Sequence, residues 1–329
     1  MTETERHKSM LAGYVSGTTV NLARVRERKG EVYLYDRSAF NNRDFSDFEA
    51  ILSRYLKQYP GDDEALCLGV AGPVINDEVR TTNLPWYLSG SSLQRKFSFE
   101  RVRLVNDLVA TAHGLFVLKK DRFYTINEGI QARQGNIGLL AAGAGLGEAL
   151  ILFGGDRYIP YASEGGHAGF APGSQDEVGL WEYLYAQQGY VEVEDVISLS
   201  GMVSIYLFML ERERAVMPDW FKKARDKSSA IIEHALSGRD TVAVNALDLF
   251  VGCYASEVAG LALKGMTLGG IYLGGVIAPH IIAAMDQGRF MRRFVKKGKM
   301  EALLADIPVG VILDDKTALL GAAAMLLTS

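Results

Sequence analysis

Two polar residues, Asn106 and Asp107, stand between a short apolar run and a segment with helical spacing. Residues 102–105 are typical of a buried strand, and residues 108–116 are typical of a helix. Either side chain can cap a helix N-terminus, and we expect that ordinary role for one of them. The other, Asp107, would then lie at the carboxyl end of a buried strand, where open α/β sheets bind ligands. A lone carboxylate at that place is a candidate general base.

Four glycine-bearing turns follow apolar strands, at residues 13–18, 143–147, 165–166 and 274–275. One such turn is weak evidence, because glycine is the usual residue wherever φ is positive. Two of them between paired strands indicate backbone N–H groups that face a shared cleft, as in phosphate-binding sites. A P-loop is excluded, since no Gly-x-x-x-x-Gly-Lys-Ser/Thr stretch exists, and residues 143–147 lack the Gly-x-Gly-x-x-Gly spacing of dinucleotide-binding folds.

The composition is that of a soluble globular α/β protein with one large domain or two. A net charge of −4 gives no electrostatic reason to expect nucleic acid or an anionic membrane as partner. The two cysteines, Cys67 and Cys253, stand in apolar runs, which predicts buried reduced thiols and a cytoplasmic protein. The polar N-terminus cannot serve as a signal peptide. No Cys/His cluster has the spacing of a structural zinc site, so we expect no such metal.

The first part of the chain predicts a meander of three antiparallel strands at residues 10–15, 18–26 and 31–39. A capping box at Ser46 predicts a helix to about Gln58, and two strands follow at residues 66–70 and 79–82. A strand, a small-residue turn and two further strands recur at residues 137–142, 148–153 and 157–161. We interpret this recurrence as a coarse internal duplication that produces two similar lobes.

Helices dominate the second half of the sequence. A second capping box at Ser174 predicts a helix to about Gln188, and residues 192–266 are almost entirely helical in pattern. We expect further strands at residues 123–126, 269–273 and 309–313, and further helices at residues 276–285 and 317–327. The long apolar segments at residues 137–155 and 251–285 are interrupted by glycine and charged residues, which favours protein core over membrane spans.

Six motifs, in order along residues 11–325, resemble those of the bacterial glucokinase family. They are Asn83-x-x-Trp86, Val105-Asn-Asp107, the turn at 143–147, Glu164-Gly-Gly-His167, Glu194 ahead of Ser200-Gly201, and residues 269–279. The resemblance implies a two-lobed actin-like ATPase (ribonuclease H-like) α/β fold, with the active site in the interdomain cleft. It also implies a small domain of residues 1–108, completed by residues 315–329, and a large domain of residues 109–314. The related zinc-containing branch is excluded, because no cysteine follows His167 at the required place.

The resemblance also implies the residues of the site. Those expected to hold a hexose are Asn83, Asn106, Asp107, Glu164, His167 and Glu194. Asp107 would accept the proton of the 6-hydroxyl. Those expected to contact phosphate or nucleotide are Gly17, Thr18, Gly143, Gly145, Gly274 and Gly275. The implied ligands are glucose, ATP and Mg²⁺, and the implied assembly is a homodimer.

The nucleotide side departs from the family pattern in its first turn. Where the family has Asp-x-Gly-Gly-Thr, this chain has Tyr14-Val-Ser-Gly-Thr18, so Tyr14 replaces a carboxylate that helps to hold Mg²⁺. Two functions then remain open: a glucokinase with impaired phosphoryl transfer, or a weak or inactive relative that senses glucose or regulates a partner. Tyr14 separates the two, unless a carboxylate elsewhere, at Glu148, Asp314 or Asp315, supplies the missing charge.

Overall fold

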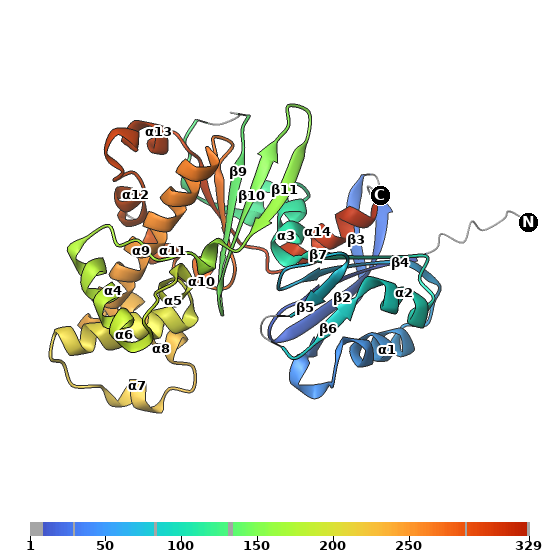
Figure 1. Cartoon of the computed structure of the whole chain (residues 1–329), viewed down its shortest axis with the longest axis horizontal. Coiled ribbons are helices and arrows are strands. Elements are labelled where there is room, and N and C mark those ends of the chain that lie inside the picture. Colours follow the sequence, from blue (N-terminus) through green and yellow to red (C-terminus); the bar gives the residue numbers. More distant parts are fainter. Residues whose placement is uncertain (1–8, 29, 82–83, 131–133, 287, 328–329) are drawn as a thin grey trace, which may run out of the picture. The chain divides into compact units, whose positions relative to one another are not determined.

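The chain forms two compact units, each built on its own β-sheet (Figure 1). The computed structural model describes residues 9–28, 30–81, 84–130, 134–286 and 288–327. Unit 1 combines the chain up to Lys120 with the C-terminal segment from Asp314, and unit 2 comprises the residues from Asp121 to Leu313. The domain division expected after residue 108 stays a prediction.

The sheet of unit 1 has the strand order β3-β2-β1-β4-β7. Its strands are β1 (Ser9–Val15), β2 (Thr19–Arg28), β3 (Glu31–Asn41), β4 (Asp63–Val70) and β7 (Arg101–Asn106). The first three form the predicted antiparallel meander, and β4 and β7 run parallel to β1. A separate hairpin, which the sequence pattern did not predict in full, pairs β5 (Glu78–Arg80) with β6 (Tyr87–Ser89).

Helices cover both faces of this sheet. The helices of one face are α1 (Phe48–Gln58) and α2 (Gly90–Phe97), whose apolar side chains pack on the sheet through Ile51, Leu52 and Leu93. The other face carries α3 (Asp107–Leu115) and α14 (Thr317–Leu327). One prediction needs correction: the cap of α1 is Asp47 rather than Ser46, because the Asp47 carboxylate accepts a hydrogen bond of 2.8 Å from the Ala50 N–H. A carboxylate at this position also interacts favourably with the helix dipole.

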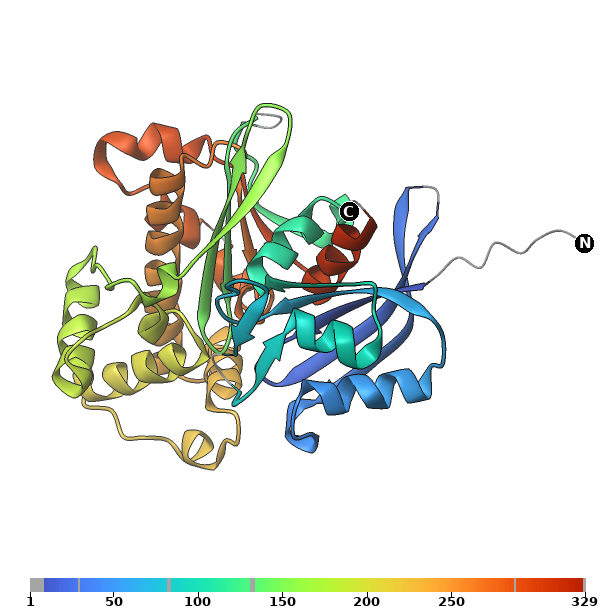
Figure 2. The ribbon, with the colours of Figure 1, turned by 45° about the vertical axis from the view of Figure 1, so that its right-hand side comes forward.

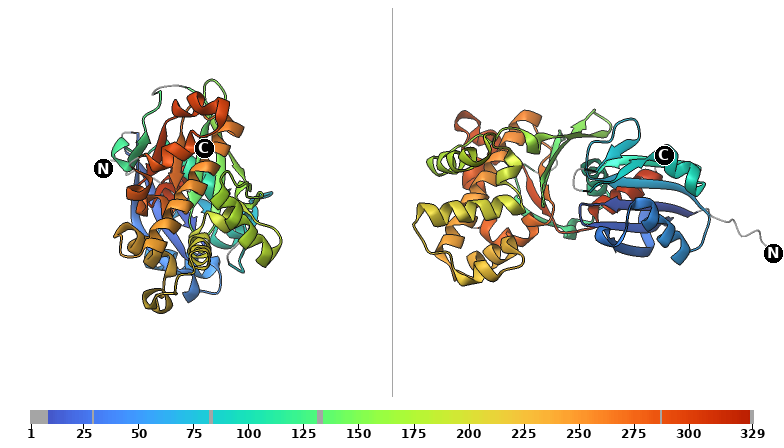
Figure 3. Two further views of the ribbon diagram at one scale, coloured as in Figure 1. Left: turned by 90° about the vertical axis from the view of Figure 1, so that its left-hand side faces the viewer. Right: turned by 60° about the horizontal axis from the view of Figure 1, so that its bottom comes forward.

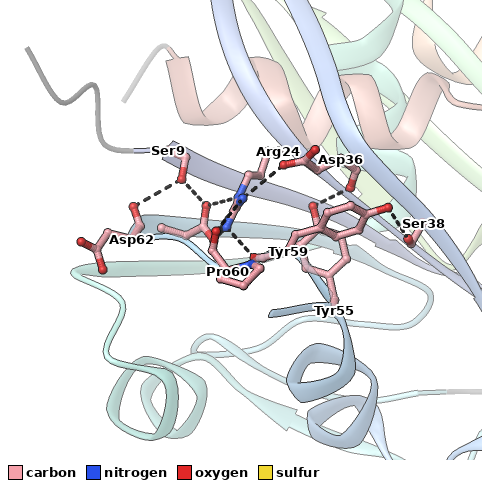
Figure 4. Close-up of polar contacts among 9 residues, drawn as sticks. Ser9, Arg24, Asp36, Ser38, Tyr55, Tyr59, Pro60 and Asp62 are labelled. Atoms are coloured by element: carbon pink, nitrogen blue, oxygen red, sulfur yellow. Dashed lines mark hydrogen bonds and ion pairs between the residues drawn. The ribbon is translucent and has the colours of Figure 1, made fainter. Parts of the chain in front are cut away.

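A buried charge cluster joins the meander to the start of β4 (Figure 4). The Arg24 guanidinium contacts the Asp63 carboxylate through both Nε (2.9 Å) and Nη2 (2.9 Å), and its Nη1 lies 3.1 Å from Asp36. Nη2 also donates to the carbonyl of Tyr59 at 2.9 Å. The side chains of Arg24 and Asp63 are only 7% and 1% exposed, so each charge depends on its partner for compensation. These contacts connect β2, β3, the start of β4 and the segment before it, so the cluster stabilises the fold of unit 1.

The sheet of unit 2 has the order β11-β10-β9-β12-β13-β8. Its strands are β9 (Ile137–Ala142), β10 (Leu146–Phe153), β11 (Tyr158–Ser163), β12 (Ile271–Gly274), β13 (Val309–Ile312) and β8 (Phe123–Asn127). The first five repeat unit 1 in order and direction, with three antiparallel strands followed by two parallel ones. The predicted internal duplication is therefore confirmed, although β10 begins two residues earlier than we expected.

Helices gather beside the sheet of unit 2, as Figures 2 and 3 show from further directions. They are α4 (Gln175–Gln188), α5 (Val193–Val196), α6 (Leu199–Arg212), α7 (Asp219–Lys223), α8 (Lys227–Leu236), α9 (Thr241–Gly265), α10 (Ile277–His280), α11 (Ile282–Met285), α12 (Arg289–Phe294) and α13 (Glu301–Ala305). Short 3-10 turns are η1 (Asn42–Asp44), η2 (Lys120–Arg122), η3 (Gly165–His167) and η4 (Gly298–Met300). The single helix predicted over residues 276–285 is instead two short helices that meet at Ile281.

The longest helix, α9, is apolar on most of its surface and lies in the core of unit 2. By length and composition alone it could cross a membrane, but 67% of its most apolar window is buried inside the protein. It therefore has the properties of a core helix, as the sequence predicted. Both cysteines, Cys67 and Cys253, are also fully buried, and burial raises the pKa of each thiol.

Candidate functional site

The predicted base lies at the carboxyl edge of the sheet of unit 1. The parallel strands β1, β4 and β7 place Tyr14 beside Gly69 and Gly69 beside Val105, and Asp107 follows directly after β7. Gly69 leaves room for the first turn of α3, since a Cβ on Gly69 would lie only 2.8 Å from the Ala110 Cβ, with the Asp107 Cα in van der Waals contact at 3.8 Å. The sheet register therefore brings Asp107 over Gly69 and next to Tyr14.

Asn106 caps helix α3, as expected for one of the two polar residues. Its Oδ1 accepts hydrogen bonds from the N–H groups of Leu108 (2.9 Å) and Val109 (3.4 Å), and its Nδ2 donates to the Gly72 carbonyl at 3.1 Å. Asp107 begins the helix, and its Oδ1 lies 3.0 Å from the Leu108 N. The positive end of the helix dipole favours the ionised form of this carboxyl group, which is the form that can accept a proton.

Tyr14 packs on the same face of the sheet as helices α3 and α14. Burial of the phenol, together with the negative charge of Asp107, raises the pKa of Tyr14 above its usual value. Tyr14 is therefore neutral at physiological pH. A neutral phenol donates a hydrogen bond, but it cannot supply the negative charge that a metal-binding carboxylate would supply.

The turn between β1 and β2 is closed by Ser16. The Ser16 hydroxyl accepts from the N–H groups of Thr18 (3.3 Å) and Thr19 (3.1 Å), and the Ser16 N–H donates to the Thr19 carbonyl at 2.9 Å. Gly17 and the exposed Thr18, two of the residues predicted to contact phosphate, form the tip of this turn. The serine that replaces the family's glycine thus uses two of the turn's amides internally.

Three carboxylates and a histidine gather after β11 in unit 2. His167 Nδ1 lies 2.6 Å from Glu192 Oε2, and its Nε2 lies 3.9 Å from Glu164 Oε2. The Tyr190 hydroxyl donates to the His167 carbonyl at 3.2 Å. Hydrogen bonding to Glu192, with further attraction from the charge of Glu194, raises the pKa of His167. With Glu164 and His167 both exposed, this group can present charged acceptors and a donor to a polyhydroxy ligand.

Glu194 connects this group to the second glycine turn. Its Oε2 accepts a hydrogen bond of 2.7 Å from the Leu146 N–H, and its carboxylate packs where a side chain at Gly145 would lie. Gly143 accepts a hydrogen bond of 2.8 Å from the Leu199 N–H. The predicted sugar residue Glu194 therefore braces the predicted phosphate turn.

The third glycine turn lies next to the second. Gly274 is paired with Ala141 across β12 and β9. Gly275 has a φ of 79°, and a side chain there would collide with the backbone of Ala142. The structure thus brings Gly143, Gly145, Gly274 and Gly275 together at the carboxyl ends of β9 and β12, and their contact with phosphate or nucleotide stays a prediction.

The predicted site residues form two sets, one in each unit. Those of unit 1 are Gly17, Thr18, Asn106 and Asp107, and those of unit 2 are Gly143, Gly145, Glu164, His167, Glu194, Gly274 and Gly275. Asn83 lies outside the described residues. Glu192 was not among the predicted residues. It forms a reciprocal capping box with Asp195 at the start of α5, but its contact with His167 has no local signal in the sequence.

The residues near Tyr14 do not fit a family-type Mg²⁺ site. No group of three or more His, Cys, Asp or Glu that could hold a metal is found within the described ranges. Glu148 is 3% exposed, so its carboxyl group does not face open space. Asp314 and Asp315 precede α14, whose first residue, Thr317, packs against Gly114 at the far end of α3 from Asp107. We therefore assign no carboxylate to replace the missing aspartate, and we derive no step through the metal.

Comparison with known proteins agrees with this geometry. A sequence profile of the family described as Glucokinase matches residues 11–329. A glucokinase from a Nostoc species is 34% identical, over 95% of this chain and 97% of that protein. A glucokinase from Cronobacter sakazakii is 31% identical, over 97% of each chain.

The solved structures give the fold. The crystal structure of a glucokinase from an Antarctic psychrotroph matches with a TM-score of 0.85 at 28% identity, and it covers 98% of this chain and 100% of that one. A glucokinase from Balamuthia mandrillaris matches with a TM-score of 0.83 at 20% identity, over 98% of this chain and 94% of that one. The fold expected from the sequence, the two-lobed actin-like ATPase fold, is confirmed. The chain belongs to the glucokinase family, and its enzyme class is that of the ATP-dependent hexose kinases.

Proposed function

We propose that this chain transfers the γ-phosphoryl group of ATP to the 6-hydroxyl of glucose, with Asp107 as the base. The observation that carries the proposal is the position of Asp107, which stands at the start of α3 and at the carboxyl edge of the sheet. There the helix dipole favours the charged form of the carboxyl group, and the edge of the sheet is where ligands of such folds bind. A base that removes the hydroxyl proton contributes part of the rate, and correct positioning of the two substrates contributes much of the rest.

The sugar would be held mainly by the group after β11 in unit 2. Glu164 and Glu194 offer carboxylate oxygens to sugar hydroxyls, and His167, held by Glu192, offers an Nε2 atom. Asn83 and Asn106 complete the proposed set. Asn106 caps α3 and so holds the neighbouring Asp107 in place. Any contact that Asn106 itself makes with the sugar would add to this contribution. A polyol is well recognised by such a set, since each lost partner leaves a buried hydroxyl unpaired.

The nucleotide would lie against the glycine turns. The proposed contacts for phosphate or nucleotide are Gly17, Thr18, Gly143, Gly145, Gly274 and Gly275, with Mg²⁺ accompanying ATP. We further propose a homodimer in the cytoplasm.

Phosphoryl transfer should be slow in this chain, because Tyr14 stands where the family has a metal-binding aspartate. Stabilisation of charge on the transferring group is the main task in such reactions, and a neutral phenol contributes little to it. Binding of glucose depends mainly on unit 2, and in unit 1 on residues other than Tyr14, so it should be little affected. This combination is also what a glucose sensor would show, so the rate decides between the two functions.

The test is a steady-state assay for glucose-dependent ADP formation by the purified protein, run beside calorimetry of glucose binding. We expect glucose to bind and ADP to form at well below about 10 s⁻¹, the median of enzymes in general. Asp107→Asn is the control for contaminating kinases, and its ADP formation should be far lower. Glucose binding without any ADP above that control would instead support the sensor, and the absence of glucose binding would overturn both.

A further inference from the structure

A carboxyl group that the proposed mechanism does not use lies buried in the middle of unit 2. Glu148 is on the core face of β10, between Leu146 and Leu150, and is 3% exposed. Its Oε1 is buried and has no hydrogen-bond partner among the residues that the structure describes. The Tyr254 hydroxyl on α9 is also buried and has no hydrogen-bond partner among the residues that the structure describes. The charge of Glu148 adds to burial in raising the pKa of Tyr254. Isolated polar atoms of this kind are costly in a core, so a functional reason is worth seeking.

Glu148 lies directly beneath the turn that carries the proposed sugar residues. A side chain at Gly165 would collide with the Glu148 Oε2, so the carboxyl group and the turn are in close contact. The backbone of Glu148 is tied to the same turn, because the Ser163 hydroxyl donates to the Glu148 carbonyl at 3.1 Å. The Gly165 N–H in turn donates to that hydroxyl at 3.2 Å.

The second glycine of the turn, Gly166, packs against β10, the strand that carries Glu148. A side chain at Gly166 would collide with the Leu146 carbonyl, and the N–H of Leu146 donates to Glu194. Residues 146–148 therefore support the turn from Glu164 to His167 and also hold the carboxylate of Glu194. A change in the shape or charge of Glu148 would therefore displace Gly165 before other parts of the turn. Gly165 is one residue from Glu164 and two from His167.

The charged groups that surround Glu148 do not neutralise it. Helix α9 contributes Glu257, which repels a negative charge, and Lys264, which attracts it, and these two pair with each other at 3.7 Å. The turn carries the exposed Glu164 and His167, the β11 residue opposite Glu148 is Ser163, and β9 contributes no titratable group. Beyond α9, Lys297 donates to Ser256 and interacts with Glu257.

Because burial and, secondarily, Glu257 oppose ionisation, the pKa of Glu148 is raised to about 7. The carboxyl group therefore changes charge within the physiological pH range. Ionisation in a site without a partner requires water or a cation to enter, or the neighbouring backbone to move. Of the elements around Glu148, the short turn at Gly165 is the one whose movement would disturb the sugar residues.

We propose that Glu148 is a positioning residue for the sugar-binding turn, so that glucose binds tightly when this carboxyl group is protonated and more weakly when it is ionised. The inference rests on the proposed function only in naming glucose as the ligand. The role of Glu148 is distinct from those of Glu164 and Glu194, because its buried carboxyl group touches the turn and not the sugar.

The test compares the wild type with Glu148→Gln, which keeps the size of the side chain but cannot ionise. Glucose binding is measured by calorimetry from about pH 6 to about pH 8.5. If ionisation and binding are coupled by one pKa unit, wild-type affinity falls about tenfold over this range. The variant should lose most of that fall, and the part that remains reports on His167. Glu211→Gln, which removes an exposed carboxylate of the same unit, should follow the wild type.

Hydrogen exchange in the absence of glucose provides a second measurement. After correction for the intrinsic pH dependence of exchange, the amides of residues 164–168 should lose protection above about pH 7 in the wild type and keep it in Glu148→Gln. Equal pH dependence of both glucose affinity and protection in the two proteins would overturn the inference and leave the proposed function intact. If no protein binds glucose at any pH, the proposed function fails, and hydrogen exchange alone still decides the role of Glu148.

Discussion

The sheets of the two units have the same strand order over five strands, but one buried carboxyl group on each sheet, Asp63 in unit 1 and Glu148 in unit 2, has opposite surroundings. In unit 1, Asp63 is 1% exposed and is held by the Arg24 guanidinium, at the end of the sheet away from the site. In unit 2, Glu148 is 3% exposed, its Oε1 has no hydrogen-bond partner among the described residues, and it lies beneath the turn that carries Glu164 and His167. A paired charge serves the fold, whereas an unpaired one beside a site is a candidate for function.

The equivalent first turns of the two sheets differ in a related way. The turn between β1 and β2 is closed on itself by Ser16 and is preceded by the neutral Tyr14. In the turn between β9 and β10 the Gly143 N–H donates to the Gly145 carbonyl at 2.8 Å, and the carboxylate of Glu194 braces the turn. Unit 2 therefore carries the carboxylates and the histidine proposed to bind the sugar, while unit 1 carries the proposed base, Asp107, but has Tyr14 in place of the family's aspartate. The following predictions test this contrast.

The largest effect is expected at Asp107, the remaining carboxylate of the unit 1 site. Asp107→Asn keeps the shape of the side chain and one acceptor atom, so glucose should still bind. Turnover should fall by roughly 10²–10⁴-fold, the usual contribution of a positioned base. Steady-state kinetics and calorimetry on the same preparation measure the two quantities, and a wild-type rate in this variant would remove Asp107 from the mechanism.

The unpaired carboxyl group of unit 2 should make folding stability depend on pH. The pKa of Glu148 is about 7 in the folded protein and near 4.5 in the unfolded chain, so the folded state retains a proton that the unfolded state releases. The stabilising contribution is full below about pH 4.5 and is lost as pH rises to about 7, a change of about 3 kcal/mol. Urea denaturation near pH 5 and pH 8 should show this loss in the wild type and not in Glu148→Gln. An equal loss of unfolding free energy in the wild type and in Glu148→Gln would contradict the raised pKa of Glu148.

Removal of a sugar contact in unit 2 should weaken binding without a specific effect on the chemical step. Glu164→Ala should cost about 1–3 kcal/mol of glucose binding, because a sugar hydroxyl loses its partner. Glu211→Ala, an exposed glutamate on α6, is the matched control. Calorimetry that found equal affinities in Glu164→Ala and the control would remove Glu164 from the site.

The smallest effect is expected at Glu192, which orients His167 but is not itself a proposed sugar contact. In Glu192→Gln the pKa of His167 should fall, because the hydrogen bond that raises it is weakened. The pair is largely exposed to solvent, so glucose affinity should change by at most about a few-fold. NMR titration of the His167 ring measures the pKa directly, and an unchanged value would contradict the role of Glu192.

Much of this site could be predicted from the sequence, because its residues lie at the ends of strongly patterned elements. The apolar run before Asn106 and the cap that follows it are local features, so the position of Asp107 followed from them. Glu192 was missed because its function depends on a contact with His167, 25 residues away, that no local pattern indicates. The burial of Glu148 was missed for the same reason, since a glutamate in an apolar strand can face solvent or core until the sheet is assembled.

The central claim is that the chain binds glucose but transfers phosphoryl groups slowly because Tyr14 replaces a carboxylate. The direct test measures turnover and glucose affinity in the wild type and in the double variant Tyr14→Asp/Ser16→Gly, which restores the turn of the family. Our account predicts a turnover about tenfold higher or more in the variant, equivalent to about 1.4 kcal/mol of transition-state stabilisation, with nearly unchanged glucose affinity. A wild type that already turns over at about 10 s⁻¹ or faster, with no gain in the variant, would contradict it.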